Sequence, residues 1–176
     1  MRSSTPLPHR LALCVLALVL GPACDSGAEG PLPSVGWFEA AVTGDVEARF
    51  SGDATVQRQT LAPGEPASLS VVMTARDVTT GRTRHSLGFL DPDGVVDGPG
   101  TYSLDLAERG LSLTYLDRSS GLPFGAVAGS VRITLFEEGR VEGTFQADLL
   151  DPFVEGGERR ARVEGSFRAR ALAAPR

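Results

Sequence analysis

The amino-acid sequence predicts an all-β protein, an antiparallel meander of about eight or nine strands. The main observation is strict alternation near the C-terminus, where residues 141–149 and 163–169 place an apolar or small side chain at every second position. A period of two is what a strand with one buried and one solvated face requires. Elsewhere short apolar runs alternate with turn residues, and no convincing helical pattern is present. This spacing is typical of a small barrel or a two-sheet sandwich, and both architectures stay open.

Residues 1–23 form a predicted export signal. Arg2 and Arg10 give it a positive start, Leu11–Leu20 is a continuous apolar run, and Gly21-Pro22-Ala23 supplies small residues before a cleavage point. A run of ten residues is too short to cross a hydrocarbon core of about 30 Å as a helix. We therefore expect this segment to be removed and not to remain as a membrane span.

The residue after this signal is Cys24, preceded by Ala23. These residues resemble the bacterial lipoprotein signal, in which a lipobox ends in a cysteine that is acylated and becomes the mature N-terminus. Gly21 stands where that family prefers Leu, with Leu20 one place too early, and Cys14 inside the apolar run fits the pattern less well. The resemblance implies lipidation of Cys24 and a membrane anchor for an exported protein of the bacterial cell envelope. The alternative is ordinary secretion, as a soluble or periplasmic protein, with the same cut.

The remaining chain is predicted to be a tether followed by one domain. Residues 24–36 contain the anchor cysteine and a Gly- and Pro-rich stretch without periodicity, and residues 37–172 form a single β-domain. Removing the signal leaves 153 of the 176 residues, enough for one domain that buries about 70% of its unfolded surface. It also changes the formal net charge from −5 to −7, which argues against a nucleic-acid partner. Cys24 would be the only cysteine left, so no internal disulfide is expected.

Strand-like runs occupy the first two thirds of the domain. Trp37 begins the first run and is predicted to plug the core. Residues 54–61 are a further candidate strand, and residues 118–125 are predicted to be a loop. The clearer runs lie at residues 38–43, 45–51, 68–76, 83–90, 101–106 and 111–115. Alternation predicts these inward side chains: Val46, Ala48, Phe50, Leu69, Val71, Met73, Ala75, His85, Leu87, Phe89, Tyr102, Leu104, Leu106, Leu111, Leu113 and Tyr115.

The C-terminal part predicts a hairpin between residues 129–136 and 140–149. A two-residue loop at Glu138-Gly139 would set apolar side chains opposite polar ones. A three-residue loop, Glu137-Glu138-Gly139, keeps them matched and uses Gly139 in the left-handed conformation. The pairs expected from it are Leu135 with Val141, Ile133 with Gly143, and Val131 with Phe145.

Two inward glycines are expected to make room for aromatic rings. Gly143 and Gly165 each precede an inward phenylalanine by two positions, Phe145 and Phe167. A glycine within a strand usually marks a bend or a close approach by a neighbour. We expect a facing ring at both positions.

The sequence offers little catalytic chemistry. His85 is the one histidine after residue 23, so a His-rich zinc site is excluded and a Ser-His-Asp triad would have to use it. It falls on the apolar face of its strand, which favours a hydrogen-bonded core or rim histidine over a catalytic one. No glycine-rich phosphate loop opens a helix, so no nucleotide or other cofactor is predicted.

Three carboxylates, Asp91, Asp93 and Asp97, are candidates for a cation site. Three acids within seven residues could bind calcium through oxygen, but the spacing fails the EF-hand pattern. The Asp-Pro-Asp-Gly sequence is a strong turn signal, because Pro presets φ, Asp bonds its own backbone and Gly accepts a positive φ. We predict a turn and no metal site.

The C-terminal arginines give an acidic protein a basic edge. Arg162, Arg168 and Arg170 are expected to share an outward face with Asp148 and Glu142 and to form cross-strand pairs. Contact with anionic lipid headgroups is a second possibility for these side chains.

The sequence favours an exported β-domain that acts by binding, or as a structural component of the envelope, more than an enzyme. In overall plan it resembles the many uncharacterised bacterial lipoproteins that carry one small β-domain. Its partners would be the membrane, through Cys24, and an envelope protein or a small molecule. One alternative is a lipocalin-like barrel that carries a small apolar ligand, because Gly143, Ala147, Gly165 and Ala169 could line a cavity. Another is a hydrolase that uses carboxylates such as Asp91 and Asp93.

Overall fold

Antiparallel strands make up the protein in a computed structural model that describes residues 36–60, 63–104, 110–119, 121–151 and 158–172. Within these residues there are nine strands and no helix, so none that could cross a membrane. The predicted signal, Cys24 and the tether lie outside the described residues. The strands are β1 (Gly36–Gly44), β2 (Ala48–Gln59), β3 (Ser68–Arg76), β4 (Thr83–Asp91), β5 (Gly100–Ser103), β6 (Ser112–Asp117), β7 (Leu122–Glu137), β8 (Arg140–Asp151) and β9 (Arg159–Arg170).

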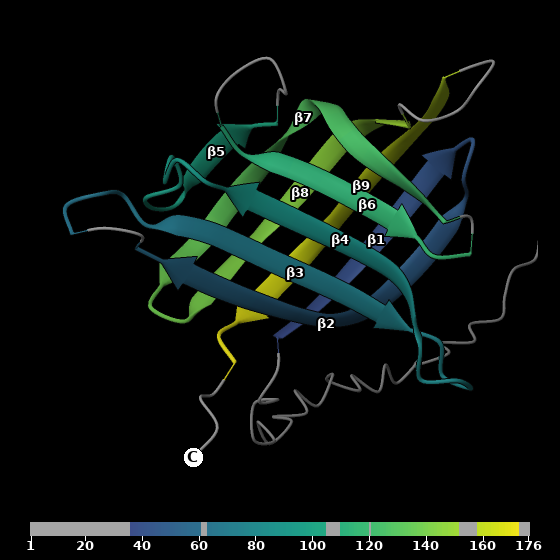
Figure 1. Ribbon diagram of the computed structural model, residues 1–176, viewed down its shortest axis with the longest axis horizontal. Helices are drawn as coiled ribbons and strands as arrows, with labels where there is room; N and C mark the ends of the chain where they lie inside the picture. The colour runs from purple at the N-terminus through teal and green to yellow at the C-terminus, as the bar shows by residue number, and fades with distance from the viewer. Residues whose placement is uncertain (1–35, 61–62, 105–109, 120, 152–157, 173–176) are drawn as a thin grey trace, which may run out of the picture. The chain divides into compact units, whose positions relative to one another are not determined.

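Eight of the nine strands close into a barrel (Figure 1). Going round the barrel the order is β7, β6, β4, β3, β2, β1, β9 and β8, and β8 pairs with β7 to complete the ring. The pairing of β1 with β9 brings the first and last strands together. The fold is therefore all-β, as predicted, and a closed barrel is the one of the two open architectures that forms.

β5 and β6 lie along the same edge of β7. β5 pairs with Ser130–Ile133, and β6 pairs with Leu122–Gly125. Both run antiparallel to β7, so together they act as one interrupted strand of the barrel wall. β7 is the longest strand in the described residues, and the two short strands pair with separate parts of its edge.

The alternating strand directions define two ends of the barrel. The proximal end, as we call it, is where β1 begins at Gly36 and β9 finishes at Arg170, and where β2–β3, β4–β5 and β7–β8 are connected. The distal end, on the right in Figure 1, is where β1–β2, β3–β4, β6–β7 and β8–β9 are connected. The described chain therefore starts and ends at the same end of the barrel.

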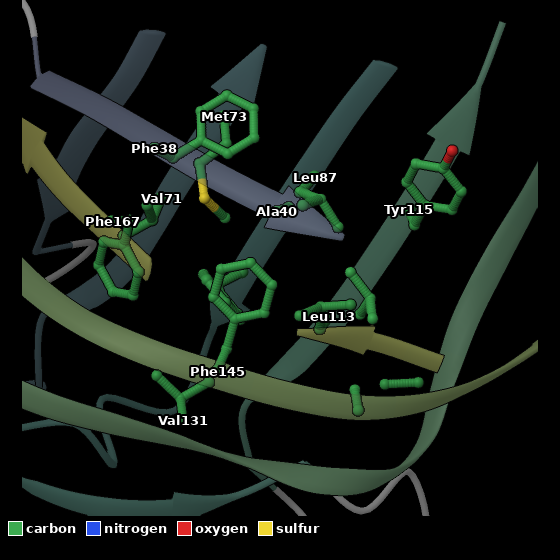
Figure 2. Packing of buried hydrophobic residues seen from close by; sticks show 14 of the residues in the cluster. Phe38, Ala40, Val71, Met73, Leu87, Leu113, Tyr115, Val131, Phe145 and Phe167 are labelled. Atoms are coloured by element: carbon green, nitrogen blue, oxygen red, sulfur yellow. The ribbon is translucent and has the colours of Figure 1, made fainter. Parts of the chain in front are cut away.

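Large apolar side chains fill the barrel interior. Because every second residue of each strand points inward, all the main strands contribute to one cluster (Figure 2). Phe89, Phe145 and Phe167 contact one another there, with ring centroids 5.2–6.4 Å apart. Phe38, Met73 and Tyr115 are completely buried. Such a core stabilises the barrel mainly by removing apolar surface from water.

Strand positions agree best with prediction where the alternation is cleanest. β3 has the predicted bounds, with Leu69, Val71, Met73 and Ala75 buried on one face. β2 is one continuous strand, although the sequence suggested separate runs at 45–51 and 54–61. Its Gly52 lies so close to the β3 backbone at Ala75 that a Cβ atom there would be 2.9 Å from that Cα. The predicted loop at 118–125 is wrong in its second half, because β7 begins at Leu122.

The β7–β8 hairpin differs from the predicted register at its turn. Glu137 pairs with Arg140, so the turn has two residues, and Leu135 faces Glu142 instead of Val141. A β-bulge between Ile133 and Leu135 then restores the predicted pairs of Ile133 with Gly143 and Val131 with Phe145. The prediction of a three-residue loop is wrong because the extra residue is placed in the strand and not in the turn. Gly139 does adopt the left-handed conformation, with φ of 72°.

The two inward glycines face aromatic rings, as predicted. Gly143 pairs with Phe167, and Gly165 pairs with Phe145. A Cβ atom on Gly165 would lie 2.7 Å from Cζ of Phe145, and one on Gly143 would lie 3.2 Å from Cε1 of Phe167. The missing side chains thus leave the space that the two rings occupy.

Trp37 is not a core plug. Phe38 takes the inward position at the start of β1, and Trp37 points outward with 39% of its surface exposed. The guanidinium of Arg168, on the neighbouring β9, lies 5.6 Å from the Trp37 ring centroid. Two adjacent aromatic residues at a strand start fit either phase of the alternation, and the smaller ring is the one that enters the barrel.

Candidate functional site

A cluster of polar and aromatic side chains lies inside the distal end of the barrel. We call it the distal cluster, and its members are Phe50 from β2, His85 from β4, and Tyr115 and Asp117 from β6. His85 pairs with Asp117 across the two strands, and Leu87 pairs with Tyr115. All four side chains have the inward phase of their strands, which is why they meet.

His85 is the centre of the distal cluster. Its Nδ1 lies 3.1 Å from the hydroxyl oxygen of Tyr115 and 3.9 Å from Oδ1 of Asp117. The Phe50 ring stacks on the imidazole with a centroid separation of 4.4 Å. Only 8% of His85 is exposed. The structure thus agrees with the prediction of a hydrogen-bonded core or rim histidine.

Burial decides the ionisation of this histidine. Desolvation lowers the pKa of His85 below 6.5, and the charge of Arg84 lowers it further, against the opposing effect of Asp117. Desolvation also raises the pKa of Tyr115 to about 12. At neutral pH the imidazole and the phenol are therefore both neutral and share one hydrogen bond.

The pKa of Asp117 is also lowered, and for a carboxyl group this favours the charged form. Burial alone would raise the pKa of Asp117, but hydrogen bonds from Ser119, the charge of His85 when it is protonated at acid pH, and the charge of Arg84 lower it overall. Its Oδ1 accepts a bond of 2.9 Å from the Ser119 backbone N–H and one of 2.7 Å from the Ser119 hydroxyl. The carboxylate is thus held by the turn that follows β6.

The distal cluster does not have the arrangement of a nucleophilic triad. In such a triad a serine hydroxyl donates to the imidazole, and a carboxylate orients the imidazole from its other nitrogen. Here Ser119 donates to Asp117, and the group bonded to His85 is the phenol of Tyr115. The geometry suits a pH-dependent packing element better than acyl transfer, and we assign no catalytic residue.

Of the three carboxylates considered for a cation site, Asp91 holds the β4–β5 connection. Asp91 is completely buried, and its two oxygens accept bonds of 3.0 and 2.8 Å from the backbone N–H groups of Val95 and Val96. Gly94 has a φ of 65°, as the turn interpretation requires. Asp93 and Asp97 are exposed, and the described residues contain no group of three potential ligands that could hold a metal ion.

An apolar ligand would have little room inside the barrel. The small residues Gly143 and Gly165 do not line a space of their own, because Phe167 and Phe145 fill it. The other two small residues, Ala147 and Ala169, are buried in the same packed cluster. This packing weighs against the lipocalin-like carrier.

A groove crosses the outside of the barrel wall. It has a volume of about 880 Å³ and runs over β1, β2, β7, β8 and β9. Both signs of charge line it, with Glu39 and Glu164 beside Arg49 and Arg132. Mixed charge on an open surface selects no single ligand chemistry.

Two of the C-terminal arginines form the predicted cross-strand pairs. Arg162 lies 3.7 Å from Asp148, and Arg168 lies 3.8 Å from Glu142. The side chains are mostly well exposed, so each pair contributes little to stability. Their charge is compensated on the barrel wall.

Sequence reasoning placed His85, Leu87 and Tyr115 on inward faces but did not bring the distal cluster together. His85 and Tyr115 are 30 residues apart in the sequence. Their contact depends on the pairing of β4 with β6, which are neighbours in the wall although β5 lies between them in the sequence. The available signal was that an inward histidine needs a hydrogen-bonding partner, and Tyr115 is one of two tyrosines in the chain.

Comparisons with family models, with curated proteins and with solved structures found no match to this chain. What the barrel does must therefore be argued from its own residues, and its closed fold is compatible with a binding or a structural role.

Proposed function

We propose that this chain is an exported, lipid-anchored domain of the bacterial cell envelope that acts by binding or as a structural component. The observation that carries the proposal is Cys24, which follows Ala23 at the end of an apolar export signal. The packed barrel supports a role without catalysis, because its interior holds side chains and its one buried histidine is engaged by Tyr115.

The direction of the strands indicates which end of the barrel is connected to the anchor. Cys24 lies twelve positions before Gly36, and a chain of that length spans at most about 40 Å. The proximal end of the barrel, where Gly36 lies, would then be held near the membrane. The distal end is the end without the tether and would be open to a partner.

Fractionation of cells expressing Cys24→Ser tests the anchor. Each buried CH₂ of an acyl chain contributes about 0.8 kcal/mol, so two or more chains hold a protein stably in a membrane. We expect the natural protein in the membrane fraction, and Cys24→Ser in the soluble fraction or as an uncut precursor. Cys14→Ser is the matched control and should leave the distribution unchanged.

Chemical labelling gives a second readout of the same anchor. The chain contains no lysine, so after cleavage the only amine and the only thiol would both belong to Cys24. Membrane-fraction protein should resist thiol reagents, and amine reagents as well once the amine is acylated. A soluble natural protein with a titratable thiol on Cys24 would refute the proposal.

A further inference from the structure

Four arginines gather at the distal end of the barrel, on the outside of the wall. Arg76 ends β3, Arg82 precedes β4, Arg84 lies within β4, and Arg118 follows β6. They line an open pocket of about 730 Å³, which we call the arginine pocket. The β3–β4 and β6–β7 connections on the right of Figure 1 mark its position.

Strand pairing forces these side chains together. The backbone N–H of Arg118 donates a bond of 2.9 Å to the carbonyl of Arg84, so the two residues are direct neighbours. Arg76 pairs with Thr83, the residue before Arg84. Because His85 and Asp117 point inward, Arg84 and Arg118 point outward on the same face.

The β3–β4 turn holds its part of the pocket in a fixed shape. Oδ1 of Asp77 accepts bonds of 2.9 and 2.8 Å from the backbone N–H groups of Thr79 and Thr80, and one of 3.1 Å from the Thr80 hydroxyl. The Asp77 N–H donates to the Arg82 carbonyl at 2.8 Å. The turn thus positions Arg82 beside the strand residues before any ligand arrives.

The positive charge of the pocket exceeds the negative charge beside it, although Arg84 interacts electrostatically with Asp77 and Asp117. None of the ion pairs that form within the described residues involves any of the four arginines. The one acidic side chain lining the pocket, Asp77, is bonded to its own turn. Neighbouring like charges repel each other. In a chain of net charge −5, the four arginines therefore form a local region of positive charge.

We propose that the arginine pocket binds a phosphoryl group. A phosphoryl group carries close to two negative charges and three strong acceptor oxygens, and guanidinium groups bind such oxygens in pairs. The pocket is larger than one such group, so it also accepts part of the molecule that bears it. This inference rests on the proposed function: the pocket lies at the end of the barrel opposite the tether, and its charge names the chemistry of the partner that this end would meet.

Titration calorimetry with inorganic phosphate and pyrophosphate tests the proposal. The full-length chain is used with Cys24→Ser in every sample, so that no acyl chain contributes, and the ionic strength is kept constant because salt screens exposed charges. The pocket variant is Arg84→Gln with Arg118→Gln. The control is Arg49→Gln with Arg132→Gln, which removes the same charge from two exposed arginines outside the pocket.

We expect binding by the parent and the control, and a dissociation constant at least about tenfold larger for the pocket variant. All four side chains of the variants are exposed, so equal melting temperatures will show that each protein is folded. Equal affinity of the pocket variant and the parent would overturn the proposal.

Vesicles of phosphatidylglycerol distinguish a lipid headgroup from a soluble phosphate. Binding to vesicles alone, lost in the pocket variant, assigns the phosphoryl group to a lipid. Binding to pyrophosphate alone, lost in the same variant, assigns it to a soluble molecule. Absence of binding to phosphate, pyrophosphate and vesicles would overturn the proposal while leaving the anchor at Cys24 untouched, since fractionation tests that separately.

Discussion

The imidazole of His85 lies face to face with the ring of Phe50, with centroids 4.4 Å apart and planes 14° from parallel. One of these residues belongs to β4 and the other to β2, and β3 separates the two strands in the wall. The contact therefore crosses the interior near the distal end. It places a titratable ring in apolar packing, where protonation is unfavourable.

This contact predicts a stability that depends on pH. The pKa of His85 is lowered below 6.5 in the folded protein, so the unfolded chain binds the proton more readily. The stability contributed by neutral His85 is present in full above about pH 6.5 and is lost as the pH falls towards the folded pKa. Melting temperatures measured between pH 8 and 5 should fall over the acid half of that range.

His85→Gln is the variant that isolates this effect. Glutamine can still bond the Tyr115 hydroxyl but does not titrate, so the decrease in melting temperature near pH 6 should become smaller. An unchanged pH profile in His85→Gln would show that other groups cause the decrease.

The hairpin register predicts which cysteine pair can be cross-linked. Phe136 lies opposite Val141, so Phe136→Cys with Val141→Cys should form a disulfide on oxidation. Leu135→Cys with Val141→Cys should not, because Leu135 faces Glu142. Peptide mapping by mass spectrometry separates the new bond from the native cysteines. The opposite outcome would favour the three-residue turn.

A side chain at position 165 is expected to cause a steric clash inside the core. In Gly165→Ala the new methyl group would clash with the backbone carbonyl oxygen of Glu39 and approach Cζ of Phe145 at 2.7 Å, so we expect a loss of about 1–3 kcal/mol in unfolding free energy. Gly125→Ala is the matched control within a strand, because a Cβ there meets nothing within 4 Å. Urea unfolding measures both, and equal midpoints for the two variants would contradict the packing described.

Asp91 is expected to stabilise the β4–β5 connection through its hydrogen bonds. Asp91→Ala leaves the N–H of the buried Val96 without its acceptor, and such a loss costs about 1–3 kcal/mol. Asp93→Ala removes an exposed carboxylate and should change the unfolding free energy by less than about 0.5 kcal/mol. Denaturant unfolding of the two variants gives the comparison.

Calcium provides the companion experiment for the same segment. Millimolar calcium should leave the melting temperature unchanged, because the Asp91 oxygens are already bonded to backbone N–H groups. A ligand at about 100 times its dissociation constant would add roughly 2.7 kcal/mol, which is several degrees for a domain of this size. A rise of that amount would return the cation site to consideration.

Sequence alternation predicted the strands wherever apolar and polar residues alternate without interruption, as in β3 and β8. It failed where a glycine or a bulge changes the phase. Gly52 divided β2 into two predicted runs, and Gly121 and Pro123 made the start of β7 read as a loop. Bulges are set by the curvature that a closed wall needs, so counting residues around a turn cannot locate them.

The candidate sites were less predictable than the strands, because they depend on which strands become neighbours. The turn at Asp91 was predicted, since its residues are consecutive. The distal cluster and the arginine pocket were not, since His85 meets Tyr115, and Arg84 meets Arg118, only after β4 pairs with β6. That pairing skips β5, and no local pattern records it.

The pairing of β1 with β9 also sets the order of events during folding. Among the described strands β1 is the first along the chain and its partner β9 is the last, so the wall stays open between β1 and β8 until β9 has been synthesised. Pairings that are distant in sequence form slowly, and an open edge is a template for aggregation. A chain cut before Arg159 would keep the edges of β1 and β8 unpaired for its whole lifetime. Protection of these two edges by a chaperone before β9 arrives would therefore raise the yield of folded barrel.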